Sequence, residues 1–312
     1  SADAQGYASQ AVDAQNGIGP GYGQGGSVHG AAGGSHGGKG GAGDAGSYYT
    51  SSPVYGSAMM PEDLGSSGGT HWGGPSGAGG GAIRMTVGGT LTLDGLITAN
   101  GGNAYGHAGG GAGGSLWVTA ATLAGGGHFE ADGGDRYPGY AGGGGGGGRI
   151  AVYYGDGGAF SGFAAGSAQG GSGAEHNGEI GSELYINTSG VYGSLDVFSA
   201  AELAGTSGVY DASNIYSGSL ALGPGFVLKA GALNVDTGAV MTVGGGSTLM
   251  ISDTLRVAGG ATLLCRGLNT TGRVDGAWAG QGVTIQAEDA VVEAGGLISA
   301  DAQGYRGGAG VG

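Results

Sequence analysis

The sequence predicts an all-β fold, a parallel β-helix (β-solenoid) from which long glycine-rich excursions extend. Three observations support this prediction. Short runs alternate apolar and polar side chains, as strands with one buried face do; the runs recur at nearly constant spacing; and 86 of the 312 residues are glycine, gathered between the runs. Parallel pairing needs a crossover connection, and a coil that returns to the same face after each crossover gives stacked rungs. We therefore expect residues 1–312 to form a single β-solenoid module.

The first element is a long glycine-rich insertion at 8–81. Its composition also suits a flexible linker, but aromatic residues are spread through this and the other glycine-rich stretches. Glycine chains can pack very closely, as they do at the axis of collagen. Some excursions are therefore expected to form packed polyproline-II or polyglycine-II strands, whose ordering entropy many hydrogen bonds between strands would have to offset.

Rungs with glycine-rich loops are expected at 82–155. The step from Ile83 to Leu116 is 33 residues, and the step from Leu116 to Ile150 is 34. A second series places Ile97 and Phe129 32 residues apart. The repeated runs are Ile83-Arg-Met-Thr-Val87, Leu116-Trp-Val-Thr-Ala120 and Arg149-Ile-Ala-Val-Tyr-Tyr154, with Leu96-Ile-Thr-Ala-Asn100 and His128-Phe-Glu-Ala-Asp132 following the first two.

Compact coils are expected at 190–298, where glycine becomes less frequent and the runs shorter. Successive runs begin 6 to 8 residues apart, so that three of them fill a coil of about 20 residues, a usual size for a three-sided solenoid. These runs begin at Phe226, Ala232, Val240, Thr248, Thr254 and Thr262.

The end of the chain repeats its beginning. Ser1-Ala-Asp-Ala-Gln-Gly-Tyr7 recurs without change at Ser299-Ala-Asp-Ala-Gln-Gly-Tyr305, a step of 298 residues (299 minus 1). A short duplicated linker would explain the match, but successive identical modules explain it together with the shorter repeat. On that interpretation 299–312 starts the next repeat, and copies of this chain are its partners. The expected assembly contacts are Ser1, Ala2, Asp3, Tyr7, Ser299, Ala300, Asp301 and Tyr305.

Composition limits the other partners. The formal net charge is −14, with only 9 Lys and Arg residues, which argues against nucleic acid because phosphate binding needs clustered cations. No apolar run approaches the roughly 20 residues that cross a bilayer. Cys265 is the single cysteine, and its apolar surroundings favour a packing residue over a nucleophile.

Acidic residues give the only candidate for catalysis. A β-solenoid can be a polysaccharide lyase or hydrolase, which would need two or three carboxylates converging on one face, or acidic calcium ligands beside an Arg or Lys base. Glu130, Asp132 and Asp135, with Arg136 nearby, come closest. The alternative is that Asp132, Asn100 and Asp301 are equivalent turn residues, which cap strands by side-chain to backbone hydrogen bonds. We favour the second interpretation and expect no catalytic, metal or cofactor site. An isolated calcium ion at Asp132 and Asp135 lacks the support of a calcium-binding repeat motif.

Aromatic residues in the glycine-rich stretches suggest a surface for carbohydrate or for neighbouring fibres, because their rings combine an apolar face with a polar handle. The candidate contacts are Trp72, Tyr105, Tyr137 and Tyr140.

The glycine-rich run that ends in Arg149-Ile-Ala-Val-Tyr-Tyr154, preceded by Gly113-Gly-Ser-Leu-Trp-Val-Thr-Ala120 and Leu96-Ile-Thr-Ala-Asn-Gly-Gly102, resembles the glycine-rich repeats of very large bacterial cell-surface and adhesin-like proteins. It is similar, more loosely, to the filamentous-haemagglutinin class. The resemblance implies a secreted or surface-bound protein for attachment, sheaths or fibres, with no catalytic residues to carry over. The expected function is a non-enzymatic structural module of an extracellular fibre or surface layer that assembles end to end. A glycan-binding adhesin module and a polysaccharide lyase or hydrolase are the alternatives.

Overall fold

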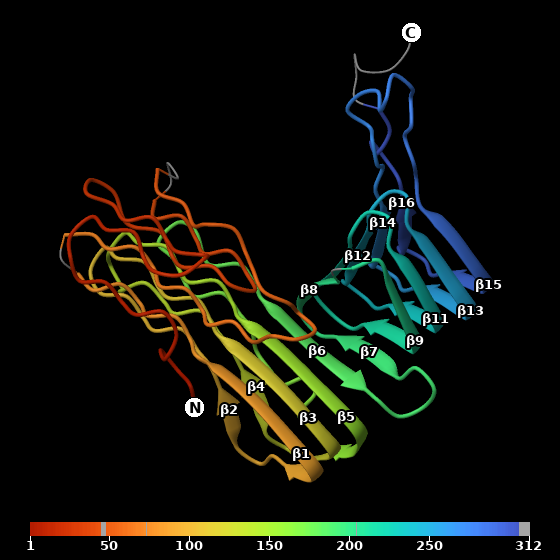
Figure 1. Ribbon diagram of the computed structural model, residues 1–312, viewed down its shortest axis with the longest axis horizontal. Coiled ribbons are helices and arrows are strands. Elements are labelled where there is room, and N and C mark those ends of the chain that lie inside the picture. The colour runs from red at the N-terminus through yellow and green to blue at the C-terminus, as the bar shows by residue number, and fades with distance from the viewer. Residues whose placement is uncertain (45–47, 73, 204, 306–312) are drawn as a thin grey trace. The chain divides into compact units, whose positions relative to one another are not determined.

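The computed structural model describes residues 1–44, 48–72, 74–203 and 205–305. Within these ranges the chain forms β-strands and no helix, and the strands pair in parallel, which confirms the all-β prediction. The chain divides into two compact units, Ser1–Tyr185 (unit 1) and Ile186–Gly312 (unit 2), which are described one at a time (Figure 1). Part of the expected next repeat, 306–312, lies outside the described residues.

The strands of unit 1 follow the 33-residue repeat. Strands β1 (Ala82–Thr92), β3 (Ser115–Gly125) and β5 (Arg149–Phe160) are neighbours in one parallel sheet, followed by β6 (Ser182–Asn187), in which the unit boundary falls. Strands β2 (Leu96–Thr98) and β4 (His128–Glu130) form a second, two-stranded sheet.

The predicted spacing gives the observed register. Ile83 pairs with Leu116 and Leu116 with Ile150, and Ile97 pairs with Phe129. Leu116, Ile150 and Phe129 are fully buried, as the alternation of apolar and polar residues requires when one face of each strand packs inward.

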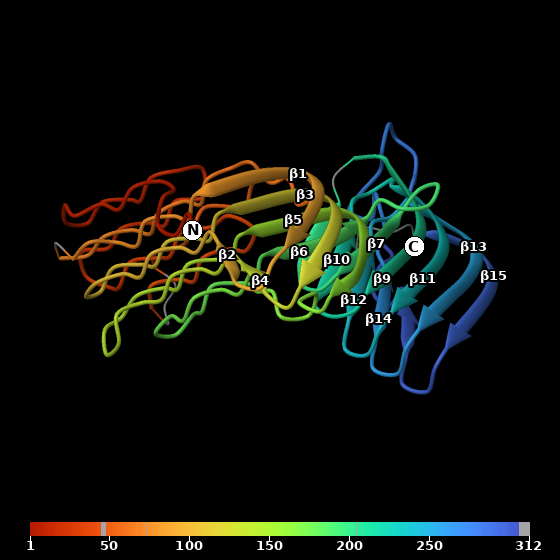
Figure 2. The same ribbon diagram turned by 90° about the horizontal axis from the view of Figure 1, so that it is seen from below.

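The described glycine-rich segments of unit 1 lie side by side in both views (Figures 1 and 2). Successive N–H groups of such a segment donate to three different neighbouring segments in turn, and every third N–H donates to the same neighbour. The six N–H groups of 143–148 donate, in order, to the carbonyls of Ala31, His176, Gly134, Gly34, Glu179 and Ala131. The six of 109–114 donate likewise to Gly69, Gly143, Gly102, Ser66, Gly146 and Ala99.

These segments pack backbone against backbone. A Cβ atom built on Gly145 would lie 1.9 Å from the carbonyl oxygen of Gly111, and one on Gly146 would lie 2.0 Å from that of Gly38. No side chain could move aside, so these positions require glycine. Polar residues of the insertion are buried with the backbone, and Ser66, Ser67 and Thr70 are each 0 % exposed.

Unit 2 contains two series of parallel strands. One runs in the order β7 (Ser194–Val197), β9 (Ser207–Ile215), β11 (Val227–Val235), β13 (Thr248–Val257) and β15 (Thr284–Val292). The other runs in the order β16 (Leu297–Ser299), β14 (Thr262–Cys265), β12 (Val240–Val243), β10 (Ser219–Leu222) and β8 (Ala200–Leu203).

The expectation of separate runs at Phe226, Ala232, Thr248 and Thr254 was wrong in one respect. The first two runs merge into β11 and the next two into β13, with register shifts after Ala230 and after Ile251. A bulge bends a strand without ending its pairing, so the chain changes direction inside a strand instead of between two. The core of unit 2 consists mainly of aliphatic side chains, among them the fully buried Leu228, Leu233, Val235, Met241, Leu249 and Val257, and includes the ring of Phe226.

Candidate functional site

The heptapeptide Ser1–Tyr7 lies beside Thr98–Asn100, at the end of β2 in unit 1. The Ala2 N–H donates to the Thr98 carbonyl (2.8 Å), as the Ala99 N–H donates to Glu130 and the Ala131 N–H to Ser167 (2.8 Å each). The heptapeptide is thus placed before Thr98–Asn100 in the same way that Thr98–Asn100 is placed before Glu130–Asp132. Alanine recurs at the equivalent position of each segment, as Ala2, Ala99 and Ala131, and Ala99 and Ala131 are fully buried.

Side-chain hydrogen bonds link the same neighbouring segments. The Asp3 carboxylate accepts the Asn100 N–H (2.8 Å), the Asn100 amide oxygen accepts the Asp132 N–H (2.7 Å), and the Asp132 carboxylate accepts the Gln169 N–H (2.7 Å). Partial burial acts to raise the pKa of Asp3, but hydrogen bonds from Asn100, Ser1 and Thr98 outweigh it and lower that pKa. This series of side-chain acceptors corresponds to the turn-capping interpretation of Asn100 and Asp132.

The candidate catalytic carboxylates are held by the same kind of contacts. Glu130 lies 3.0 Å from His128 Nε2 and accepts the Asn100 amide, while Asp135 accepts the N–H and hydroxyl of Ser172. Arg136 donates to the carbonyls of Tyr137 and Tyr140. Asp3, Asp132 and Asp135 do line one groove of about 450 Å³, yet in the described part of the chain no group of three His, Cys, Asp or Glu side chains could hold a metal ion.

The second copy, Ser299–Tyr305, has the same conformation as the first. The Asp301 N–H donates to the Ser299 hydroxyl (3.0 Å), as the Asp3 N–H donates to that of Ser1 (3.1 Å). Ala302 has a φ of 55° and Ala4 one of 50°, the left-handed region that alanine seldom adopts. Two segments 298 residues apart therefore form the same strained turn.

The four predicted aromatic contacts come together in unit 1. Ring centroids lie 4.8 Å apart for Tyr105 and Tyr137, and 5.5 Å apart for Tyr137 and Tyr140. His107 joins Tyr140 (4.9 Å) to Trp72 (6.0 Å). We call Trp72, Tyr105, His107, Tyr137 and Tyr140, together with His71, the aromatic cluster.

Trp72 is the most exposed member of the aromatic cluster, at 69 %. Its φ of 46° is unusual for a bulky residue, and its indole N–H donates to the Ser27 carbonyl (3.0 Å). His71 beneath it is 3 % exposed, and neither ring nitrogen has a hydrogen-bond partner among the described residues. Burial, helped by His107, lowers the pKa of His71 and so favours its neutral imidazole. Backbone strain that holds a large ring in solvent is a common property of binding sites.

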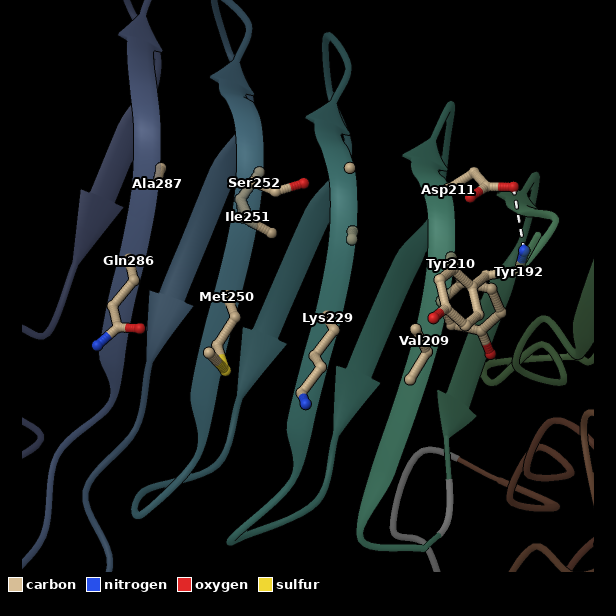
Figure 3. A pocket seen from close by; sticks show the side chains of 12 residues that line it. Tyr192, Val209, Tyr210, Asp211, Lys229, Met250, Ile251, Ser252, Gln286 and Ala287 are labelled. Carbon is tan, nitrogen blue, oxygen red and sulfur yellow. Dashed lines mark hydrogen bonds between the residues drawn. The ribbon is translucent and has the colours of Figure 1, made fainter. Parts of the chain in front are cut away.

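Unit 2 carries a surface groove of about 510 Å³ that the sequence analysis missed (Figure 3). Val209, Lys229, Met250 and Gln286 cross it as register neighbours on β9, β11, β13 and β15. Asp211 at one end accepts the backbone N–H groups of Tyr192 and Gly193 (3.2 and 3.0 Å). The register of the strands would have placed these side chains in one row, but the bulges that hollow the surface are not visible in the alternation pattern.

Cys265, at the end of β14, is half-buried, and burial raises the pKa of its thiol. That shift disfavours the thiolate and therefore nucleophilic reactivity. The described part of the chain contains no helix that is long and apolar enough to span a bilayer.

Comparison of the chain with protein-family models, curated proteins and solved structures gives no match. The structure by itself defines the chain as an all-β protein of mostly parallel strands, with its glycine-rich segments packed beside them in unit 1.

Proposed function

We propose that the chain is a non-enzymatic structural repeat module of an extracellular or cell-surface fibre or layer, of the bacterial type that its glycine-rich repeats resemble. Its parallel strands would stack with those of further copies into a continuous β-solenoid. The observation that carries this proposal is that each unit has an open sheet edge, at β1 in unit 1 and at β15 in unit 2.

The edge of unit 2 exposes residues whose counterparts in interior rungs are buried. Val292 is 47 % exposed, whereas Val257, its partner in β13, is 0 % exposed; Ile298 is 37 % exposed, whereas Leu263, its partner in β14, is 0 % exposed. An open, apolar edge is a template for another strand, and the 298-residue repeat supplies one, because the next β1 and heptapeptide would follow β15 and β16 along the chain.

The glycine-rich segments would serve as a second layer of the fibre. Three residues per turn without internal hydrogen bonds is the geometry of a polyproline-II helix, and the three-residue cycle of donors at 109–114 and 143–148 supports packed polyglycine-II strands. Such a layer has little side-chain surface, and the net charge of −14 would keep the fibre soluble along its sides.

Electron microscopy and fibre diffraction of the full chain, or of several repeats in tandem, test the proposal. Filaments of constant width with a repeat of about 4.8 Å along the axis are expected. Particles that remain single at high concentration, or filaments without that axial repeat, would refute stacking of the rungs.

The aromatic cluster favours a second function, glycan binding by the module. The exposed rings of Tyr137, Tyr140, Tyr105 and Trp72 (39–69 %) lie in a row in which His107 stands between Trp72 and Tyr140. Ring faces combined with hydroxyl and imidazole groups suit the faces and hydroxyls of a sugar. Trp72→Ala and Tyr140→Ala should each lower binding on a glycan array, whereas Tyr216→Ala, which changes an exposed tyrosine of unit 2 (42 %), should not. Equal binding by all three variants would exclude the aromatic cluster as the glycan site.

A further inference from the structure

The two copies of the heptapeptide share sequence and conformation but differ in their contacts. Ser1–Tyr7 donates from Ala2, Ala4, Gly6 and Tyr7 to the carbonyls of Thr98, Asn100, Gly79 and Gly65, at 2.7–3.1 Å. Its Ala2 and Tyr7 carbonyls accept the N–H groups of Gly81 and Gly79, and its Asp3 carboxylate accepts the Asn100 N–H and the Thr98 hydroxyl. Residues Gly65, Gly79–Gly81 and Thr98–Asn100 thus form a receptor groove of backbone groups, which we call the acceptor site.

Ser299–Tyr305 lacks this set of contacts. Among residues 1–44, 48–72, 74–203 and 205–305, nothing accepts a hydrogen bond from the N–H of Ala300 or Ala302, and nothing donates one to the Asp301 carboxylate. Ala300 is exposed, whereas Ala99 and Ala131 at the same position of interior rungs are fully buried. The contacts of Tyr305 are the Gly280 N–H (2.8 Å) and the edge of the Trp278 ring (4.8 Å).

We propose that the acceptor site is a receptor for the sequence Ser-Ala-Asp-Ala-Gln-Gly-Tyr, and that it binds Ser299–Tyr305 of a second copy of this chain in place of its own Ser1–Tyr7. This inference rests on the proposed end-to-end assembly and names the segment and the site that join two copies. Because all seven residues are identical, every hydrogen bond of the first copy can be formed by the second.

The turn is already formed in the donor segment. Ala302 has the left-handed φ that Ala4 has in the acceptor site, so binding needs no reorganisation of the turn, which lowers its entropic cost. Tyr305 has to leave Gly280 and Trp278 to take the place of Tyr7. In a single chain the covalently attached Ser1–Tyr7 competes for the site with the advantage of a high effective concentration.

Substitutions in equivalent residues of the two copies should therefore have opposite effects. Asp3→Ala removes two contacts that hold the chain's own heptapeptide and leaves the acceptor site intact. A dye-labelled Ser-Ala-Asp-Ala-Gln-Gly-Tyr peptide should then bind the Asp3→Ala variant at least about tenfold more tightly than it binds the unchanged chain. Hydrogen bonds to a charged acceptor are worth more than the 1.4 kcal/mol that corresponds to a tenfold change in the dissociation constant. Asp301→Ala, at the equivalent position of the second copy, should leave peptide binding unchanged.

A second variant covers the case in which Asp3→Ala disturbs folding. Ala4→Pro cannot adopt the positive φ and removes the N–H that donates to Asn100, so it should also free the acceptor site, and Ala302→Pro is its matched control. No gain in peptide binding by either Asp3→Ala or Ala4→Pro, with circular dichroism unchanged, would overturn the proposal. A scrambled peptide that binds equally well would overturn it too.

Sedimentation of the full chain separates this inference from the proposed function. Association that rises for Asp3→Ala and falls for Asp301→Ala supports exchange of the heptapeptide. Filaments that form equally in both variants and resist excess peptide would refute the exchange and leave end-to-end stacking standing. Peptide binding to Asp3→Ala without filaments in any variant would support the acceptor site and refute the proposed fibre.

Discussion

The glycine-rich half of unit 1 and the coils of unit 2 fill their interiors with different groups. In unit 1 the packed atoms belong to the backbone, with carbonyl oxygens at the positions where a Cβ of Gly145 or Gly111 would lie. In unit 2 the interior consists of side chains, mainly those of Leu, Val, Ile and Met, with Phe226 and several alanines. Side chains can adjust their rotamers around a change, whereas backbone carbonyls in a hydrogen-bonded array cannot move without losing partners. A substitution that adds atoms to a backbone core should therefore cost more free energy of unfolding than a substitution in a side-chain core.

The largest effect is expected for Gly145→Ala. The added methyl carbon would lie 1.9 Å from the Gly111 carbonyl oxygen, and only movement of a whole segment could relieve the overlap. The free energy of unfolding of unit 1 should fall by more than about 4 kcal/mol, measured by urea denaturation followed by circular dichroism. Gly88→Ala in β1, where nothing lies within 4 Å, should change it by less than about 1 kcal/mol. Equal stability of the two variants would refute the backbone core.

Leu233→Ala tests the side-chain core of unit 2. Leu233 on β11 is 0 % exposed, so the loss should be about 2–5 kcal/mol, according to how far the neighbours collapse into the space. Leu297→Ala at the exposed edge, where the side chain is 48 % exposed, should cost much less in the single chain. The comparison would fail if Leu233→Ala unfolded unit 2 entirely while Gly145→Ala left unit 1 folded.

A buried carboxyl makes the stability of unit 1 depend on pH. Glu183 on β6 is 3 % exposed; burial raises its pKa to about 7, a hydrogen bond from Tyr185 opposes the shift, and the charge of Asp132 adds to it. Since the folded-state pKa exceeds the ordinary value of 4.5, the contribution of Glu183 is complete below pH 4.5 and is lost as the pH rises through 7. The loss should be about 3 kcal/mol.

Glu183→Gln should flatten this part of the stability profile, because an amide does not ionise. Thermal melts of unit 1 between pH 4 and 8 measure the slope. A variant that keeps the slope of the unchanged chain would assign the pH dependence to another group.

The smallest effect is a gain. Ala4→Gly and Ala302→Gly place glycine at φ values of 50° and 55°, where its lack of a Cβ relieves strain. Each should raise the free energy of unfolding by at most about 1 kcal/mol, measured as a small rise in the melting temperature. Removing a methyl group at Ala4 or Ala302 would thus stabilise the chain, whereas adding one at Gly145 would destabilise it. A loss of stability in both variants would mean that the methyl groups contribute more by packing than they cost in strain.

The sequence allowed the strand series to be predicted because side chains carry the signal. Ile83, Leu116 and Ile150 recur at the spacing that brings them into register, and the alternation shows which face is buried. The merging of two short runs into β11 was not predictable, because the bulge after Ala230 depends on pairing with neighbouring strands.

The candidate sites show the same limit. The repeated heptapeptide pointed to a segment that pairs with its neighbours in unit 1, but its partners Gly65 and Gly79 lie in a stretch without distinguishing side chains. Trp72, Tyr105, Tyr137 and Tyr140 were singled out by their residue types alone, and only the fold brings them into one cluster with His71 and His107.

The three-residue cycle of hydrogen-bond donors gives each glycine-rich segment a reading frame. Because successive N–H groups of 143–148 point to three neighbours in turn, removing one residue would rotate every later donor by about 120° toward the wrong neighbour. Removing three would shorten the segment by one turn and restore every pairing. Among natural variants of such a chain, insertions and deletions within these segments should therefore occur in multiples of three.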